Sequence, residues 1–356
     1  MSGYSAAHML RQSRALGADL RALLPRLEAE ADTVVRAASA RPVRRVVLTG
    51  SGDSYHAALA AAMAFESLAA LRCDPVPTQR FLDYGAVGPG ADGTGTLVVG
   101  ISSSGRNRRL AEALRRAGPR GSATLAVTAD PDSAVALAAD HRLVVRTSAA
   151  EPSPGILTYQ ASLAALAVVA VRLAGRRGPV PPETLLRELR ALPDEVERTA
   201  AAVETPCGEL AAKLVAARPD GPGPLAVTGT GPALGTAKYA AAKVVEACGV
   251  AAFGQDLEEW WHVERHARPG DAPLVVLAPR GRAAGRAAEL ARGAVALGRP
   301  VVVVGPHDAG TPPGSVLLPV LGAPREEWTP LLHHVFAGFL GARLALELGR
   351  VPFTPV

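Results

Sequence analysis

Two runs of serine and glycine are the residues best able to bind an anion. GSGDSY begins at Gly50 and SSSGRN follows Ile101, each directly after an apolar stretch that predicts a buried strand. Where a strand ends and a helix begins, hydroxyls and free backbone N–H groups form a cradle for phosphate. One such serine is more often only a helix N-cap, but two runs on adjacent strand ends favour a ligand. The candidate contacts are Ser51, Ser54, Ser102, Ser103 and Ser104.

Acid–base groups gather in the second half of the chain. Lys243 and Glu246 lie three residues apart on a helix predicted over 236–247, and His262 follows sixteen residues after Glu246. Residues three apart share one helix face. Spacing alone is most typical of a solvated Lys–Glu pair, and His262, beside two tryptophans, could equally be packed in the core.

A metal site near His262 is disfavoured. His266 lies four residues further on, and Glu258 and Glu259 are close in sequence, but HVERH is not the HExxH pattern. The remaining ligands of a metal centre are not supplied. We therefore expect no metal, and acid–base chemistry requires no organic cofactor.

The chain repeats itself once. VVLTGSGDSYHAALAAA from Val46 matches LAVTGTGPALGTAKYAAAK from Leu225, with four identities each 179 residues apart. LVVGISSSGRNRRLAEAL from Leu97 matches LVVLAPRGRAAGRAAEL from Leu274 at nearly the same offset, and a third, weaker match follows in the same order. Ordered matches at a constant offset indicate a duplicated unit of roughly 150 residues.

The two copies differ at the serine cradle. Ala233 stands in copy two where copy one has Ser54, and Pro279 and Arg280 replace Ser102 and Ser103. Copy two has therefore lost the cradle.

Apolar runs alternate with helical segments in both copies. The predicted strands are Val46–Leu48, Leu97–Val99, Leu143–Val145, Leu225–Val227, Leu274–Leu277 and Val301–Val304. Because strands apolar on both faces belong to buried parallel sheets, the fold class is α/β, with two doubly wound three-layer αβα units.

Four segments are expected along the chain. Residues 1–40 form a helical lead-in, residues 41–178 the first domain, residues 179–205 a linker helix and residues 206–356 the second domain. GRRGPVPP at Gly175–Pro182 marks the junction.

Three further helices are predicted. Residues 156–171 are the least polar stretch, but they are shorter than the roughly 20 apolar residues of a membrane span and hold several polar side chains, so we expect a buried helix. The bridging helix should cover 182–203, and a closing helix 331–348.

Composition excludes several classes of protein. The net charge is +5, and almost all of the basic residues are arginine. The aromatic content is 4% and no run of more than two consecutive basic residues occurs, which argues against nucleic-acid binding. Three scattered cysteines argue against a disulfide framework or structural zinc. The first residues lack the apolar core of a signal peptide. A cytoplasmic protein is expected.

With these motifs in order, the chain resembles the sugar isomerase (SIS) domain family from about Val43 to Leu348. It is most similar to the tandem-SIS isomerase half of glucosamine-6-phosphate synthase and to related aminosugar-phosphate deaminases and deglycases. GSGDSY with FESLA at Phe65–Ala69 resembles the first ligand loop, SSSGRN the Ser-x-Ser-Gly phosphate loop, and KVVE with His262 the Lys-x-x-Glu…His set. The resemblance implies two tandem SIS domains, each with a mainly parallel five-stranded sheet.

The resemblance also implies roles. Glu246 is the base that moves a proton between C1 and C2 of the sugar, and Lys243 orients or tunes it. His262 is an acid/base partner contributed by the neighbouring subunit of a homodimer, with the active site at the interface. A small-molecule sugar phosphate is the partner, with no nucleic acid and no membrane. The implied substrate contacts are Gly52, Asp53, Ser54, Ser102, Ser103, Ser104, Thr158 and Asn107, which stands where the family usually has Thr.

Three departures from the family bear on the substrate. No glutaminase segment with a nucleophilic cysteine precedes the lead-in helix, so no ammonia from glutamine is expected. No lysine follows Lys243, whereas the synthase tail carries one, which favours deaminase or deglycase chemistry. Tyr159 stands where the family commonly has Lys, and WWHVE surrounds the histidine in place of HGP, which suggests an unusual aglycone or amine.

The expected function is therefore isomerisation of an amino- or amine-adduct sugar phosphate with loss or gain of the amine. One alternative is a non-catalytic phosphosugar sensor that regulates a partner, although Lys243, Glu246 and His262 together argue against it. Another is a secondary-metabolism enzyme that forms or rearranges a sugar–amine adduct.

Overall fold

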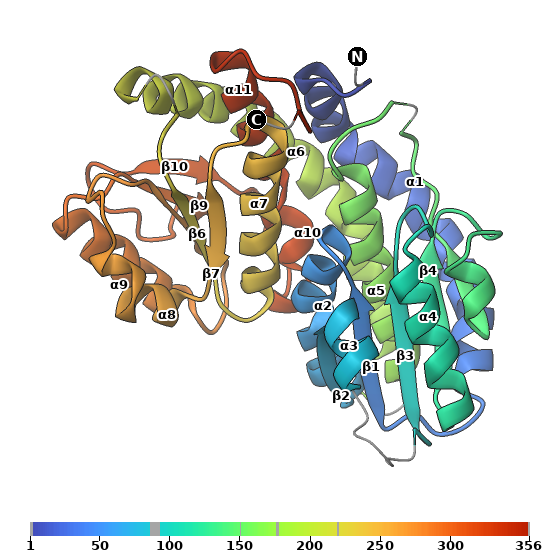
Figure 1. The fold of residues 1–356 in the computed structure, drawn as a ribbon. Coiled ribbons are helices and arrows are strands. Elements are labelled where there is room, and N and C mark those ends of the chain that lie inside the picture. The colour runs from blue at the N-terminus through green and yellow to red at the C-terminus, as the bar shows by residue number, and fades with distance from the viewer. Residues whose placement is uncertain (1–2, 86–92, 150, 176–177, 219–220, 355–356) are drawn as a thin grey trace. The chain divides into compact units, whose positions relative to one another are not determined.

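The computed structural model describes residues 3–85, 93–149, 151–175, 178–218 and 221–354 (Figure 1). The chain forms two compact units, each treated by itself. Unit 1 comprises Met1–Ala18, Ala149–Leu157 and Leu192–Val356, and unit 2 comprises Asp19–Ser148 and Thr158–Ala191. Helices α1 (Ala6–Ala38) and α6 (Pro182–Ala217) contribute residues to both units.

Unit 2 is built on a five-stranded sheet in the order β2-β1-β3-β4-β5. Its strands are β1 (Arg45–Gly50), β2 (Arg72–Pro77), β3 (Thr96–Ile101), β4 (Ala123–Thr128) and β5 (His141–Val144). All neighbouring strands are parallel. Every residue of β3 is buried, as a central strand covered on both faces requires.

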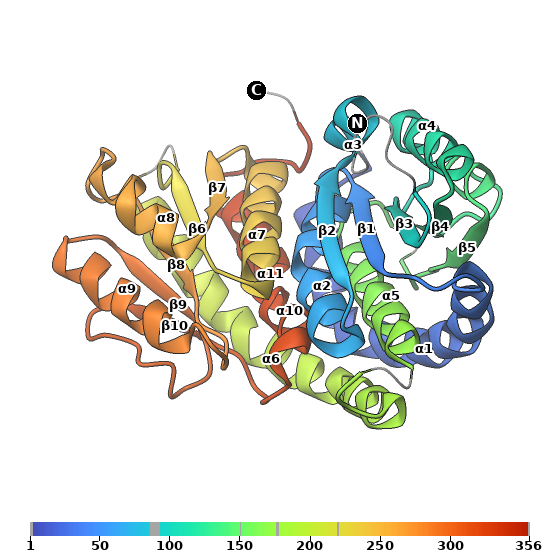
Figure 2. The same ribbon diagram turned by 90° about the horizontal axis from the view of Figure 1, so that it is seen from below.

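Helices cover both faces of the unit 2 sheet. α3 (Thr78–Tyr84) and α4 (Arg108–Ala117) lie on one face, and α2 (Asp53–Ala69), α5 (Leu157–Ala174) and part of α1 lie on the other (Figures 1 and 2). Phe81 and Leu110 pack on Val98 in the first of these layers. α5 is long and apolar enough to cross a membrane, but 83% of its apolar window is buried, so it is the core helix expected near 156–171.

Unit 1 holds a second five-stranded parallel sheet in the order β10-β9-β8-β6-β7. Its strands are β6 (Leu225–Thr228), β7 (Ala252–Gln255), β8 (Leu274–Leu277), β9 (Val301–Gly305) and β10 (Val316–Pro319). Numbered from its own first strand, each sheet has the order 2-1-3-4-5. The predicted α/β class with parallel sheets is therefore confirmed.

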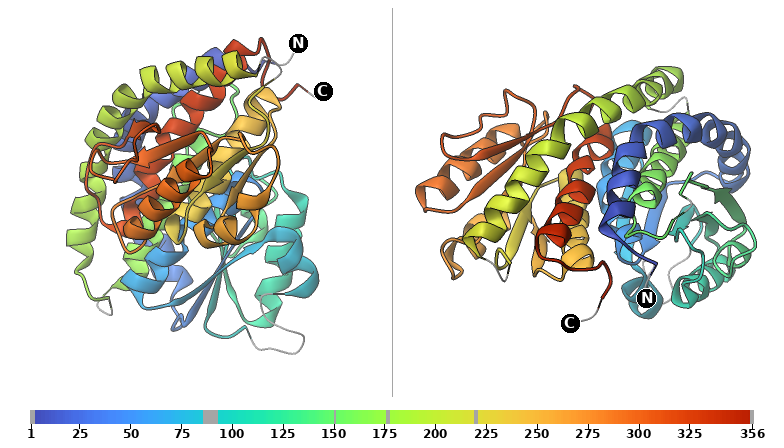
Figure 3. Two further views of the ribbon diagram at one scale, coloured as in Figure 1. Left: turned by 90° about the vertical axis from the view of Figure 1, so that its left-hand side faces the viewer. Right: turned by 90° about the horizontal axis from the view of Figure 1, so that it is seen from above.

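Unit 1 is also layered. α7 (Pro232–Cys248), α10 (Pro330–His333) and α11 (Val335–Glu347) lie on one face of its sheet, and α8 (Leu257–His262) and α9 (Ala284–Ala296) lie on the other (Figures 2 and 3). Trp260 and Leu290 pack on Leu274 in the second layer. Short 3₁₀ helices occupy Gly118–Arg120 (η1), Ala136–Ala138 (η2), Glu264–His266 (η3) and Glu326–Trp328 (η4).

Several boundaries differ from the sequence predictions. The bridging helix continues past residue 203 to Ala217, through Pro206. The closing helix is interrupted at His334, between α10 and α11. The strands β2, β4, β7 and β10 were not predicted. The first of these reads RCDPVP, in which two prolines and two charged residues hide the strand pattern. The predicted junction Gly175–Pro182 includes residues 176–177, which lie outside the described residues.

Two buried histidines at the α10–α11 break make unit 1 sensitive to acid. Burial lowers the pKa of His333 to about 4 and that of His334 to about 3. Both are therefore neutral in the folded chain at pH 7, whereas an unfolded histidine gains a proton near pH 6.5. Their contribution to stability is complete above about pH 6.5 and falls as the pH drops towards 4.

We predict that His333→Gln flattens the pH dependence of the free energy of unfolding between pH 6.5 and 4. Each such histidine contributes a slope of up to about 1.4 kcal/mol per pH unit, so removing one should lower the slope by up to that amount. Urea unfolding at several pH values measures it, with the exposed His307→Gln as control. An unchanged slope in His333→Gln would contradict the assignment.

Candidate functional site

Unit 2 brings the two serine-rich loops together. They follow β1 and β3, which are neighbours in the sheet. The Asn107 side chain joins them, because its Nδ2 donates to Ser51 Oγ at 3.3 Å while its Oδ1 accepts from the Leu110 N–H at 3.2 Å. Asn107 is thus the N-cap of α4 and a link between the loops. We call the two loops, residues 50–54 and 102–107, the serine cradle.

The backbone conformation of the cradle requires glycine at two of its positions. Gly52 is the N-cap of α2 with φ +56° and offers no side-chain cap, and a helix N-terminus without a side-chain cap is suited to binding an anion. Gly105 has φ +63°, and a Cβ there would lie 2.0 Å from Ser133 Oγ. Both positions therefore require glycine.

The predicted cradle residues differ in exposure. Ser102 is buried, Ser103 is half-buried, and Ser104 is exposed. The Arg106 N–H reaches Ser104 Oγ only at 3.4 Å, which leaves it available to a better acceptor. Ser54 and Asp53 begin α2 and are half-buried.

Two further polar groups belong to the same unit. Asp53 Oδ1 lies 3.8 Å from His56 Nδ1 on the first turn of α2, so the cradle carries a carboxylate as well as hydroxyls, and an imidazole lies beside it. Thr158 is the second residue of α5, where its carbonyl accepts from Ser162 Oγ at 2.9 Å.

Unit 1 holds Lys243 and Glu246 as an ion pair on α7. The Lys243 side chain is fully buried, and that of Glu246 is 28% exposed. The interpretation of this pair as a solvated surface pair is therefore wrong for the lysine. A buried ammonium needs a partner because taking it out of water costs several kcal/mol. Only the carboxylate reaches solvent, where it could meet a substrate.

Tyr239 supports the pair from one helical turn earlier. Its ring centroid lies 5.1 Å from Lys243 Nζ, which is a cation–π distance. Its hydroxyl donates to the Gly155 carbonyl at 3.0 Å, and its edge meets His334. Sequence reasoning missed Tyr239, although its four-residue spacing from Lys243 could have marked it.

The chain terminus also supports α7. The Phe353 N–H donates to the Glu246 carbonyl at 2.8 Å, and Arg350 Nη1 donates to the Cys248 carbonyl at 2.6 Å. Phe353 has φ +57° and stacks edge-on with Tyr4. These contacts satisfy carbonyls at the end of the helix beneath the carboxylate. No pattern in the sequence indicated them.

His262 lies on α8, on the opposite face of the unit 1 sheet from α7 (Figures 2 and 3). Its side chain is 65% exposed and its Nε2 is 3.0 Å from Glu258 Oε1, so a packed core histidine is excluded. Within unit 1, the sheet separates this imidazole from the Lys243–Glu246 pair.

The two tryptophans beside His262 are structural. Trp260 is 2% exposed in the core and lies beneath the Arg299 guanidinium. Trp261 packs on Gly293, where a Cβ would lie 2.7 Å from its ring, and it stacks with Arg265. Their packing gives a sufficient reason for both residues without an aglycone.

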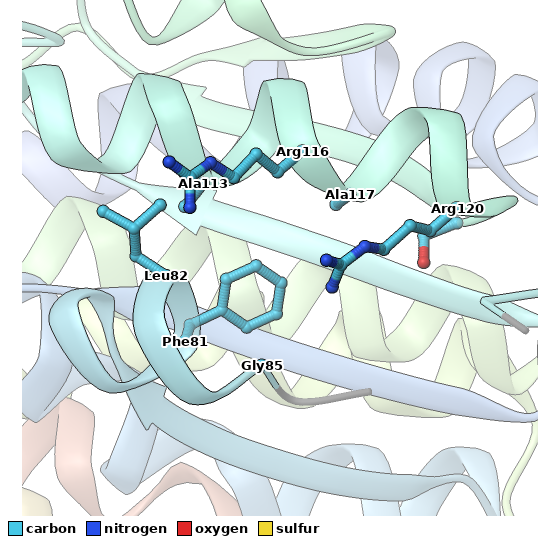
Figure 4. A pocket seen from close by; sticks show the side chains of 8 residues that line it. Phe81, Leu82, Gly85, Ala113, Arg116, Ala117 and Arg120 are labelled. Atoms are coloured by element: carbon cyan, nitrogen blue, oxygen red, sulfur yellow. The ribbon is translucent and has the colours of Figure 1, made fainter. Parts of the chain in front are cut away.

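A small pocket lies elsewhere in unit 2. Figure 4 shows Phe81 and Leu82 of α3 facing Arg116 of α4 and Arg120 of η1. It is at the end of α4 remote from Asn107, and no residue predicted to bind substrate lines it. The cradle and the Lys243–Glu246 pair remain the better candidates, because each brings polar or charged side chains into direct contact with one another.

Comparison with known proteins agrees with this geometry. Residues 41–172 match the SIS domain model. The chain is 31% identical over 171 residues to the isomerizing glutamine–fructose-6-phosphate aminotransferase of Mycolicibacterium smegmatis, covering 46% of this chain and 26% of that protein. The Mycobacterium tuberculosis enzyme is 33% identical over 177 residues, covering 48% and 27%. The chain thus contains a SIS domain, and these matches span about a quarter of the relatives' length.

Solved structures share the fold along nearly the whole chain. The C-terminal domain of glucosamine-fructose-6-phosphate aminotransferase from Francisella tularensis has a TM-score of 0.80 at 16% identity, covering 97% of each chain. Tagatose-6-phosphate ketose/aldose isomerase from Escherichia coli has 0.74 at 16%, covering 97% and 94%. Glucosamine-6-phosphate deaminase from Thermotoga maritima has 0.68 at 17%, covering 97% and 96%.

We predict that the Lys243–Glu246 pair behaves as a buried unit in unfolding experiments. Glu246→Ala leaves a buried ammonium without its carboxylate and should cost about 3–5 kcal/mol. Replacing both groups, as in Lys243→Met/Glu246→Leu, should cost less than about 1 kcal/mol because no charge remains buried.

The matched control is Glu112→Ala, which breaks the exposed Arg116–Glu112 pair on α4 and should change stability by less than about 1 kcal/mol. Urea unfolding midpoints compare the three variants. Equal costs for Glu246→Ala and Glu112→Ala would show that the α7 pair is only a surface contact.

Proposed function

We propose that this protein is a phosphosugar isomerase-type enzyme that acts on an amino- or amine-adduct sugar phosphate. The observation that carries the proposal is the carboxylate of Glu246, held at the surface of α7 by a lysine with no exposed area. Such a carboxylate would serve as the general base, and the buried ammonium beside it would add positive charge where an enolate-like transition state gathers negative charge.

The serine cradle of unit 2 would hold the phosphate. Its support is the N-terminus of α2, which has no side-chain cap, and the two loops joined through Asn107 and Ser51. A phosphate bound remotely from the reacting carbons supplies binding energy that orients C1 and C2. Gly52, Asp53, Ser54, Ser102, Ser103, Ser104, Asn107 and Thr158 are the proposed contacts with the substrate.

The chemistry is a proton shift followed by loss of the amine. For a ketose phosphate with an amine on C1, Glu246 takes the C1 proton and C2 regains one, which converts the adduct to a C1 imine. Water then adds to the imine carbon, the C–N bond breaks, and the aldose phosphate and free amine leave. General acid–base catalysis of this kind contributes about 10² to 10⁴ per group. No metal or organic cofactor is needed.

His262 would assist from a second copy of the chain. The unit 1 sheet separates it from its own Lys243–Glu246 pair, and its ring is exposed. Its imidazole Nε2 lies 3.0 Å from Glu258 Oε1, and an imidazole can both accept and donate a proton at a substrate oxygen. We therefore propose a homodimer in which each copy lends His262 to the other's Glu246.

The sheet of unit 1 would be a second, diverged SIS domain. Its strand order repeats that of unit 2. Gly52 and Gly231 begin the first helix of each sheet with nearly the same backbone angles, φ +56° and ψ −130° against φ +57° and ψ −132°. The duplicated sequence motifs and this repeated geometry support one another.

We predict that Glu246→Gln abolishes turnover and keeps phosphate binding. The amide still accepts a hydrogen bond from Lys243 but cannot take a proton, so the rate should fall by about 10² or more. Mass spectrometry of a panel of aminosugar phosphates and fructosamine-type phosphates measures amine release, and thermal shift measures binding.

Mixing Glu246→Gln with His262→Ala protein tests the shared site. If each copy lends His262 to the other, mixed dimers regain one intact site and part of the activity. Near-normal turnover by Glu246→Gln would overturn the assignment of the base. Thermal stabilisation by sugar phosphates without turnover in the wild type would indicate a sensor.

A further inference from the structure

The outer side of α4 and η1 in unit 2 carries an unbalanced positive charge. Residues 108–120 hold five arginines and one acidic residue, Glu112. Glu112 pairs with Arg116. The other four arginines are exposed, and within the part of the chain that the structure describes none of them has an acidic partner: Arg108, Arg109, Arg115 and Arg120. Their charge therefore faces solvent without compensation.

Position along α4 separates these arginines into two groups. Two of them begin the helix beside its cap Asn107, where a phosphate in the cradle would explain them. Arg115 and Arg116 lie in the last turn, and Arg120 lies in η1 beyond it, at the end remote from the cradle. Cations suit the last turn of a helix because the helix dipole is negative there. The dipole does not explain Arg120 or the surface beside it.

A groove between α3 and α4 lies next to the second group. Figure 4 shows two guanidinium groups on one side of it and two apolar side chains of α3 on the other. The groove measures about 20 Å³, which is enough for one small group such as a methyl. Tyr84 precedes Gly85 of the lining and is 77% exposed, so an apolar ring stands in water beside the groove. The lining includes Phe81, Leu82, Ala113, Arg116, Ala117 and Arg120.

The combination of charge and apolar surface decides which kind of partner fits the groove. Arginine binds carboxylates through two-point contacts, and an apolar side chain that covers the groove gains free energy by leaving water. An acidic protein segment supplies both, because a leucine or valine can stand between its carboxylates. A nucleic acid supplies charge without an aliphatic side chain. A membrane would have to reach apolar groups that lie between two helices, where Phe81 is only 7% exposed.

We propose that this groove docks an acidic segment of a partner protein. One aliphatic side chain of the segment enters between α3 and α4, and carboxylates on either side of it bind Arg115, Arg116 and Arg120. The inference goes beyond the proposed function, because none of these residues belongs to the serine cradle or to the Lys243–Glu246 pair.

The test is fluorescence anisotropy with two labelled peptides of glutamate residues at physiological ionic strength. The Leu probe has one central leucine, and the Ser probe has a serine in its place. The wild-type protein should bind the Leu probe at least fivefold more tightly than the Ser probe. Arg115→Glu/Arg120→Glu should lower the affinity for the Leu probe at least tenfold, because like charges then face each other.

Leu82→Ser separates the groove from the charge. It should lower the affinity for the Leu probe to that for the Ser probe and leave the affinity for the Ser probe unchanged within twofold. The matched control for charge is Arg187→Glu/Arg292→Glu, which reverses two exposed arginines outside the groove and should change either affinity less than threefold. If Leu82→Ser prevents folding, the comparison of the two probes on the wild type still tests the groove.

Equal affinity of the wild type for the two probes would overturn the proposal, and so would an equal loss of affinity in the charge control. Single-stranded DNA of the same net charge as the Leu probe and vesicles of phosphatidylserine and phosphatidylcholine are titrated alongside. Tighter binding of either than of the Leu probe, lost in Arg115→Glu/Arg120→Glu, would overturn the assignment to an acidic protein segment.

Discussion

The buried ammonium of Lys243 is the constraint on which the rest of unit 1 depends. A lysine without exposed area is tolerated only when a carboxylate faces it. Glu246 supplies the charge, and the Tyr239 ring supplies a cation–π face. The hydrogen bonds of Tyr239 to Gly155 and of Phe353 to the Glu246 carbonyl then fix the helix that carries the pair. The neighbourhood is built to place one carboxylate at the surface.

The two units show how one scaffold can serve two tasks. Both sheets have the same strand order and the same glycine conformation at the start of their first helix. In unit 2 the loops after the first and third strands carry hydroxyls, and α2 begins without a side-chain cap. In unit 1 the loop after the third strand is filled by Glu326, and the first helix carries Lys243 and Glu246 instead. The serine-rich loops of unit 2 and the Lys243–Glu246 pair of unit 1 thus stand at different positions of the same scaffold.

The sequence predicted the structure correctly where a residue pattern is compatible with only one kind of element. Runs such as Leu274–Leu277 are apolar on both faces, and the structure makes each a buried parallel strand. The pairing of GSGDSY with SSSGRN followed from their places at adjacent strand ends, and the Ser51–Asn107 contact bears it out. The strand β2, with the sequence RCDPVP, was not predicted, because its prolines and charged residues are typical of a loop. An edge strand nevertheless tolerates them.

Other features could not be predicted because they depend on contacts between distant segments. Lys243 is buried on a helix that packs against α10 and α11, yet its spacing from Glu246 is that of any exposed helix pair. The capping of α7 by Phe353 joins residues far apart in sequence through a backbone group, which leaves no mark in side-chain type. The exposure of His262 likewise follows from the face of the sheet on which α8 lies.

The central claim is that Glu246 moves a proton between adjacent carbons of a sugar whose phosphate the serine cradle holds. The most direct measurement is proton NMR of a fructosamine-type 6-phosphate, with the amine on C1, and of glucosamine 6-phosphate, each incubated with the wild-type protein in deuterium oxide. The account predicts that solvent deuterium enters at C1 or C2 of a bound sugar phosphate. Saturable binding of these compounds without any deuterium at either carbon would contradict it.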